Sequence, residues 1–244
     1  MTSEYKTTAV VLHSIAHGDK GMIAYLYTRE LGRVAYYMFA ARNGAVRIAG
    51  QKISLQPLSV LSIVGKTTSR GDLHRITQAQ SHLITAGIYG NIVKSSVALY
   101  MSEFLYRVIK ESESAPLLFD FIIGCIKSLN IMSDKQAANF HLYFTVNIVR
   151  FMGFYPSNSY FDGAFFDIPL SKFVLVRPQH SLHFDATTTN LLSKVMELKI
   201  DNLESLELSR NQRRELLAAL ITFLGYHHET IYKIDSLRVL KELF

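Results

Sequence analysis

The sequence has 244 residues, a single cysteine at position 125 and no tryptophan. One cysteine excludes an internal disulfide and every zinc site built from several cysteines. Cys125 lies within an apolar run, which predicts a buried thiol. No stretch approaches the roughly 18 uninterrupted apolar residues of a membrane-spanning helix, so we expect no membrane partner. The first residues include Glu4 and no small-residue cleavage site, unlike a signal peptide, and we expect a cytoplasmic protein.

Sequence patterns of catalysis are also missing. The chain has no G-x-S-x-G, H-E-x-x-H or paired-carboxylate pattern. His227 and His228 are adjacent on a predicted helix and point roughly 100° apart, so they cannot chelate a metal as an i, i+4 pair does. His180 and His183 have no acid or cysteine at the expected offset. We therefore expect neither an enzyme nor a metal protein.

The positive charge is concentrated in the first third of the chain. Residues 1–80 hold ten Lys and Arg against four Asp and Glu, a balance of +6, which equals the net charge of the whole chain. The remaining 16 bases and 16 acids cancel. Such a distribution favours an acidic partner for the N-terminal part.

The same N-terminal part has the pattern of a small all-β barrel or sandwich. Five runs rich in Val, Ile, Leu, Tyr and Thr, separated by turns, cover residues 7–16, 22–28, 32–41, 57–67 and 72–80. Gly32 closes a short turn, where we expect a positive φ. Residues 44–52 contain glycine and basic residues, which predicts a flexible loop that contacts phosphate but lacks the P-loop ending.

Aromatic residues lie within these runs, and arginines lie at the turns and at the ends of the runs. Small barrels that bind single-stranded nucleic acid combine a positive groove with such aromatic rings, on which the bases stack. Adjacent strand residues point to opposite faces, so Tyr36 and Tyr37 must diverge and about half of the aromatics belong to the core. A solvated basic surface is the alternative. The phosphate-contact candidates are Arg29, Arg33, Arg42, Arg47, Lys52, Arg70 and Arg75, and the stacking candidates are Tyr25, Tyr37 and Phe39.

From residue 81 to 244 the pattern is helical. Apolar residues at mixed three and four spacings predict helices over about 92–108, 116–129, 134–152, 186–198, 209–227 and 236–243. Ser209 and Gln212 have the spacing of a capping box. Residues 156–186 lose this periodicity and hold three of the five prolines, which predicts an irregular insertion with room for a β-hairpin. The predicted class is α+β, with domains over residues 1–80 and 81–244.

Several ordered motifs resemble the RecO family of bacterial recombination mediators. They are AVVLHSIAHGDKGMIAYLYTRELGRV, LQPLSVLSI, GDLHRITQAQ and IDSLRVLKEL, which span nearly the whole chain. The resemblance implies an N-terminal five-stranded OB-fold barrel, a C-terminal helical domain and no enzymatic turnover. It also implies a nucleoid-associated protein of the RecF pathway of DNA repair.

The resemblance further implies a set of partners. Members of this family bind single- and double-stranded DNA, anneal complementary strands, bind the acidic C-terminal tail of single-stranded-DNA-binding protein (SSB), and act with RecR to load RecA. The candidates for the SSB tail here are Lys135, His141 and Arg150.

Two positions depart from the family pattern. Many members have a four-cysteine zinc site in the insertion, where this chain has none, so no zinc or other cofactor is expected. The family's Lys-Gly pair at the end of the third strand is Phe39-Ala40 here, followed by Arg42. One phosphate contact is thereby lost or replaced by stacking.

Two other functions fit the same residues. A protein-interaction adaptor would use the basic barrel against an acidic protein surface. An RNA-binding OB-fold module would also suit it, because nothing in the sequence reads a 2′-hydroxyl group.

Overall fold

The computed structural model describes residues 3–40, 45–68, 71–110 and 113–243. Two compact units divide the chain, residues 1–130 and residues 131–244. The sequence places the domain boundary at residue 80, and that boundary stays a prediction. The helices after residue 80 that belong to the first unit are described with the barrel below.

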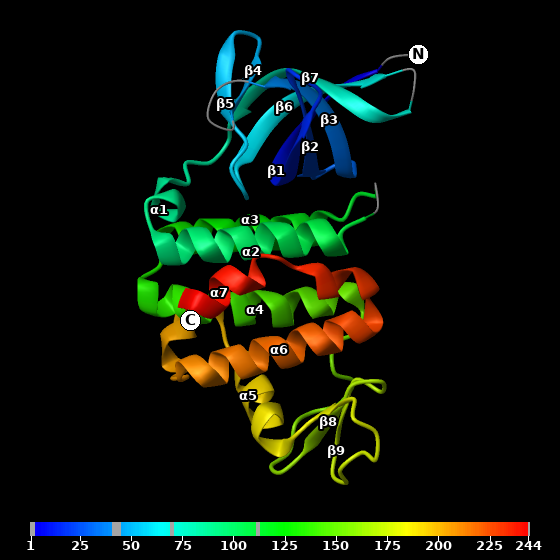
Figure 1. Ribbon diagram of the computed structural model, residues 1–244, viewed down its shortest axis with the longest axis vertical. Coiled ribbons are helices and arrows are strands. Elements are labelled where there is room, and N and C mark those ends of the chain that lie inside the picture. The colour runs from blue at the N-terminus through cyan, green and yellow to red at the C-terminus, as the bar shows by residue number, and fades with distance from the viewer. Residues whose placement is uncertain (1–2, 41–44, 69–70, 111–112, 244) are drawn as a thin grey trace. The chain divides into compact units, whose positions relative to one another are not determined.

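A closed five-stranded barrel forms the start of the first unit (Figure 1). Its strands are β1 (Glu4–His17), β2 (Gly21–Thr28), β3 (Gly32–Ala40), β6 (Val60–Thr68) and β7 (Gly71–Ser81). Each neighbouring pair is antiparallel except β3 and β7, which run parallel and close the barrel. This is the connectivity of an OB fold, so the predicted barrel and all five predicted strands are confirmed.

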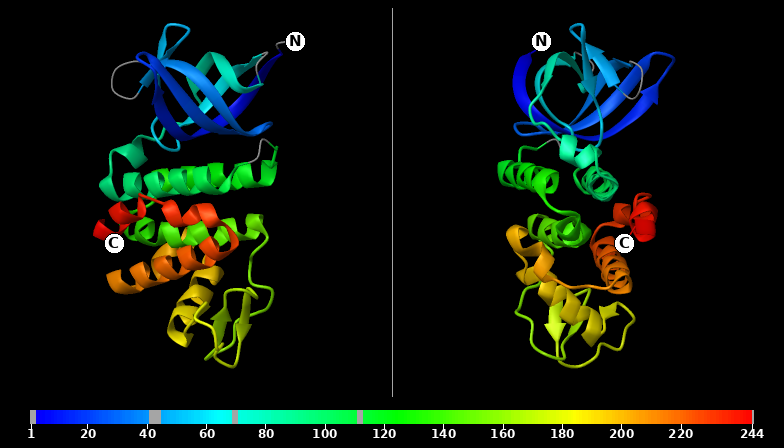
Figure 2. Two further views of the ribbon diagram at one scale, coloured as in Figure 1. Left: turned by 45° about the vertical axis from the view of Figure 1, so that its right-hand side comes forward. Right: turned by 90° about the vertical axis from the view of Figure 1, so that its left-hand side faces the viewer.

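The predicted flexible loop over residues 44–52 is wrong, because β4 (Ala45–Ile48) and β5 (Gln51–Ser54) form a hairpin there. The sequence alternates in both strands. Val46, Ile48 and Ile53 are buried in the barrel core. Ala49 and Gly50 both have positive φ values, 46° and 82°, which a tight two-residue hairpin turn requires. Figure 2 shows the hairpin beside the barrel from two further sides.

Alternate residues of the barrel strands fill its core. Leu26, Val34, Tyr36 and Met38 are at most 7% exposed. The Tyr36 and Tyr5 hydroxyl groups form a hydrogen bond, with 2.9 Å between their oxygens. At the turn between β2 and β3, Gly32 has the expected positive φ of 65°.

Three helices complete the first unit: α1 (Ala86–Tyr89), α2 (Ile92–Val108) and most of α3 (Pro116–Ile131). The Asn91 side chain caps α2 by accepting a hydrogen bond from the Lys94 backbone. The Ser102 hydroxyl of α2 donates to the backbone carbonyl of Leu12 in β1 at 2.6 Å. The helices therefore pack directly against the barrel strands.

The second unit is helical with a small sheet (Figure 1). Its helices are α4 (Asp134–Met152), α5 (Ala186–Glu197), α6 (Arg210–His227) and α7 (Leu237–Leu243), with short 3₁₀ segments η1 (Ile200–Ser205) and η2 (Glu229–Lys233). The capping box of Ser209 and Gln212 is present at α6. The predicted helical region is confirmed.

The insertion contains a three-stranded sheet of β8 (Phe165–Asp167), β9 (Lys172–Val174) and β10 (His183–Phe184). The fully buried ring of Phe166 lies 5.3 Å, between ring centres, from each of Phe173, Phe184 and Phe223. Aromatic packing therefore holds the sheet to α6.

Candidate nucleic-acid interface

Strand register brings exposed aromatic and basic residues together on one surface of the barrel. Tyr37 of β3 lies opposite Arg75 of β7, and Arg75 lies opposite Lys66 of β6. Side chains of directly opposed residues share one face of a sheet. One row of side chains therefore crosses three strands.

A second row lies two residues further along β3. Phe39 is opposite Arg47 of β4, and Arg47 is opposite Lys52 of β5. Residues two apart on a strand point the same way, so the second row continues the first. We call the surface that these rows form the basic–aromatic face, and it consists of Tyr37, Phe39, Arg47, Lys52, Lys66 and Arg75.

The two rings of this face differ in exposure, because Phe39 is exposed and Tyr37 is half-buried. Phe39 is 64% exposed, and its ring meets that of Tyr37 edge to face at 5.6 Å. The Tyr37 side chain lies over Gly21, where an added Cβ would come within 2.8 Å of a ring carbon and of the hydroxyl oxygen of Tyr37. Glycine at this position therefore lets the ring of Tyr37 lie close to the sheet. The Phe39 ring, with the edge of Tyr37 beside it, provides a surface on which bases can stack.

The cations of this face form no ion pair within the part of the chain that the structure describes. Arg47, Lys52, Lys66 and Arg75 are exposed, and no ion pair to any of them occurs among the side chains that the structure describes. Four like charges without a counter-ion create a positive potential that attracts a polyanion.

Three predicted site residues lie against the helices of the first unit instead. Arg29 forms an ion pair with Asp120 of α3 at 2.8 Å. Arg33 donates to the backbone carbonyl of Tyr106 at 3.0 Å, and its guanidinium lies over the Tyr25 and Tyr106 rings at 5.8 and 5.4 Å. Through these contacts, Arg29, Arg33 and Tyr25 help to pack the barrel against α2 and α3.

The same cluster contains a histidine. The His13 ring lies 4.5 Å from the Tyr106 ring. Burial lowers the pKa of His13, and the nearby Arg107 lowers it further. The imidazole is thus favoured in its neutral form, as suits a packed aromatic cluster. The remaining two predicted arginines, Arg42 and Arg70, lie outside the described residues.

The three candidates for the SSB tail do not share a surface, although all three lie on α4. His141 is 1% exposed, and burial lowers its pKa to about 3. Arg150 is exposed, donates to the Tyr155 hydroxyl at 2.8 Å and lies over its ring. Lys135 and Arg150 are 15 residues apart, which is about 22 Å along a helix. A short peptide anchored at both ends would therefore have to follow the helix.

The histidines of the insertion are engaged in hydrogen bonds. His180 pairs with Asp167 at 3.2 Å. One ring nitrogen of His183 lies 2.7 Å from the His180 carbonyl and the other is 3.3 Å from Arg177 Nε. The part of the chain that the structure describes has no group of three or more metal-ligating side chains, and the insertion has no cysteine. These residues do not fit the zinc site of the family.

The sequence did not identify Lys66 as a site residue, and it did not show that β4 and β5 hold Arg47 and Lys52 in place. The alternation of Val46, Arg47 and Ile48 was the available signal for the hairpin. Lys66 joins the face only through the register of β6 with β7, which no local pattern reveals.

Within the described residues, no helix combines the length and the apolar character that crossing a membrane requires. Two family models match successive parts of the chain. Residues 1–83 match the family model described as Recombination protein O N terminal, and residues 89–233 match Recombination protein O C terminal.

Three relatives carry the name DNA repair protein RecO. The chain is 32% identical over 242 residues to that of Flavobacterium johnsoniae, with 99% of both chains covered. It is 31% identical over 240 residues to that of Phocaeicola vulgatus, with 98% of both covered. It is 28% identical over 241 residues to that of Azobacteroides pseudotrichonymphae, with 98% of this chain and 99% of the relative covered.

Proposed function

Because the chain belongs to the RecO family of DNA repair proteins, we propose that it is a DNA-binding recombination mediator that catalyses no reaction. In this proposal it binds single- and double-stranded DNA and anneals complementary strands. It also binds the SSB C-terminal tail and acts with RecR to load RecA.

The basic–aromatic face carries this proposal. Its four free cations neutralise phosphates, and this contact needs no particular base sequence. The exposed Phe39 ring and the half-buried Tyr37 ring beside it stack on bases, and stacking is also tolerant of sequence. A mediator that acts on any damaged DNA needs such tolerance.

The position of the face on the barrel supports the same conclusion. OB folds bind oligonucleotides on the surface of their second and third strands and the neighbouring loops. Here Tyr37 and Phe39 belong to β3, the third strand, and Gly21 beneath Tyr37 begins β2, the second. The hairpin of β4 and β5 extends this surface with Arg47 and Lys52.

The SSB tail is acidic, and Lys135 and Arg150 provide positive charge on α4. We place His141 outside this contact, because its side chain is buried. Its neutral imidazole stabilises the interior of the second unit instead. The tail contact is proposed for the exposed surface of α4, with either cation as its anchor.

A salt titration tests DNA binding by this face. Four displaced counter-ions predict a log–log slope of affinity against salt of about −3 for a single strand. Reversing the charge of Arg47 and Lys52 together, as R47E and K52E, should reduce the magnitude of that slope by roughly half and weaken binding to all sequences alike. Fluorescence anisotropy with a labelled oligonucleotide measures both quantities.

The matched control reverses two exposed cations of the second unit, Lys172 and Lys194, and changes the net charge by the same amount. If the control weakens binding as much as the variant does, total charge rather than this face governs affinity. An affinity that does not change between low and moderate salt would contradict the proposal altogether.

A further inference from the structure

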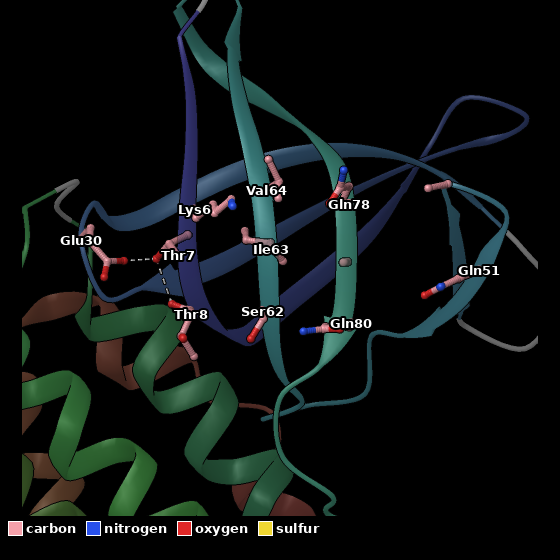
Figure 3. Close-up of a pocket in the computed structure, with 12 residues that line it drawn as sticks. Lys6, Thr7, Thr8, Glu30, Gln51, Ser62, Ile63, Val64, Gln78 and Gln80 are labelled. Carbon is pink, nitrogen blue, oxygen red and sulfur yellow. Dashed lines mark hydrogen bonds between the residues drawn. The ribbon is translucent and has the colours of Figure 1, made fainter.

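A groove on the barrel next to the basic–aromatic face is lined by polar groups that carry almost no net charge. It has a volume of about 670 Å³ and lies on the outer surface of β1, β6 and β7 (Figure 3). We call it the amide groove, and its outward polar side chains are Lys6, Thr8, Gln51, Ser62, Gln78 and Gln80.

The register of three strands builds this groove. Thr8 of β1 lies opposite Ser62 of β6, and Ser62 lies opposite Gln80 of β7. Lys6, Val64 and Gln78 form the next row in the same way. Figure 3 shows the two rows side by side, with Gln51 of the hairpin on the other side of Gln78 and Gln80.

The three glutamines keep their hydrogen-bonding groups free. The carboxamides of Gln51, Gln78 and Gln80 have no hydrogen-bond partner among the described residues, whereas the Ser62 hydroxyl pairs with His82 at 2.8 Å. Each carboxamide offers a donor and an acceptor side by side. This pattern matches the edge of a base, and glutamine pairs with adenine through two such bonds.

Charge makes the groove unsuitable as a phosphate site. Lys6 is its one cation, and Glu30 lies at its rim, hydrogen-bonded to Thr7. None of the residues that line it is aromatic, so bases cannot stack there. A base that enters the groove would be held by hydrogen bonds to its edge.

The groove continues the basic–aromatic face directly. Lys66 and Arg75 are opposite one another, and Val64 and Gln78 form the next outward row, two residues along β6 and, because of a β-bulge, three residues along β7. Rows two residues apart in an antiparallel sheet are separated by about 7 Å. A single DNA strand whose phosphates contact Lys66 and Arg75 therefore brings its neighbouring bases within reach of Gln78.

We infer that the amide groove contacts the base edges of the single strand whose phosphates the basic–aromatic face binds. This inference rests on the proposed DNA binding and adds a preference among bases to it. The cations of the basic–aromatic face set the overall affinity for DNA, and the glutamines of the amide groove make that affinity depend on the base composition of the strand.

Replacing Gln78 and Gln80 by methionine tests the inference. Methionine keeps a long unbranched side chain but lacks the amide donor and acceptor. Affinities are measured by fluorescence anisotropy for 12-nucleotide strands of dA, dC and dT. We expect the double variant Q78M and Q80M to change the ratio of the best to the worst affinity by at least about 5-fold, the size of one weak bidentate contact. The slope of affinity against salt should not change.

Gln179 lies exposed in the second unit, so Q179M is the matched control and should leave the ratios as they are. A second double variant, Q78A and Q80A, repeats the measurement without a long side chain. If both double variants keep the base ratios of the unaltered protein, while salt-dependent binding persists, the inference fails and the proposed function stands. If the unaltered protein shows no salt-dependent binding, the proposed function itself fails.

Discussion

At the scale of single residues, alternation along a strand predicts which face of the sheet a side chain points to. It does not predict whether another element covers that side chain. Tyr36 is fully buried in the barrel core and Tyr37 lies on the outer surface, as their adjacent positions predict. Tyr25 and Tyr27 both point outward, yet Tyr27 is 1% exposed because its ring packs at 5.8 Å from Phe119 of α3. Only the packing of distant helices separates an exposed tyrosine from a covered one, and no local pattern encodes that packing.

The buried His141 gives a prediction for stability against pH. Burial depresses its folded-state pKa to about 3, below the ordinary value of 6.5. Between these values the unfolded chain binds the proton and the folded chain does not, so the free energy of unfolding falls as pH decreases below about 6.5. The loss is on the order of 1 kcal/mol per pH unit, since one pKa unit corresponds to about 1.4 kcal/mol.

Urea unfolding at pH 7.5 and pH 5.5 measures this loss. A variant H141Q, which carries no titrating group, should lose less stability between the two pH values than the unaltered protein does. Equal losses in both proteins would show that other groups govern the pH dependence. H180Q is the matched control, because His180 lies near the surface of the insertion.

At the scale of elements, periodic segments were predictable and short ones were not. The five barrel strands and the helices α2 to α6 follow apolar patterns, and a side chain caps the start of α2, α4, α5 and α6. The strands β4 and β5 have four residues each, and the glycines around them predict a loop instead of this hairpin. The insertion strands have two or three residues each, too few for a periodic signal.

The packing of the insertion gives a prediction for the stability of its small sheet. The fully buried Phe166 packs on Phe173 and Phe184 of the insertion sheet and on Phe223 of α6. Truncation of a buried phenylalanine costs about 3–5 kcal/mol, so F166A should lower the free energy of unfolding by that amount. F161A, which removes a 38% exposed ring, should cost much less.

Thermal unfolding of the unaltered protein with and without a strong chelator completes this test. We expect the same midpoint in both, because packing rather than metal ligation holds the insertion. A midpoint that falls in the chelator, together with zinc found in the purified protein, would contradict this expectation.

At the scale of the whole molecule, the sequence pattern and the compact units place the boundary between the two parts of the chain at different residues. Composition and periodicity change at residue 80, where the barrel ends. The compact units instead divide after residue 130, so that α2 and most of α3 belong with the barrel. Sequence patterns report local structure, whereas the unit depends on contacts between residues about 90 positions apart, such as Ser102 with Leu12.

Truncated chains distinguish the two divisions. A fragment of residues 1–83 would expose Tyr27 and Leu12 to water and leave Arg33 without the Tyr106 carbonyl. Its barrel should therefore unfold at a lower temperature than that of a fragment of residues 1–133, which keeps these contacts. We expect the longer fragment to bind single strands with the same salt slope as the full chain, because it holds the entire basic–aromatic face.

Circular dichroism gives the two midpoints and fluorescence anisotropy gives the slopes. If the shorter fragment is as stable as the longer one, the helices contribute nothing to the barrel and the boundary at residue 80 is the physical one. If the longer fragment is folded but binds with a much smaller slope, cations beyond residue 133 contribute to DNA binding, and the face on the barrel is only part of the interface.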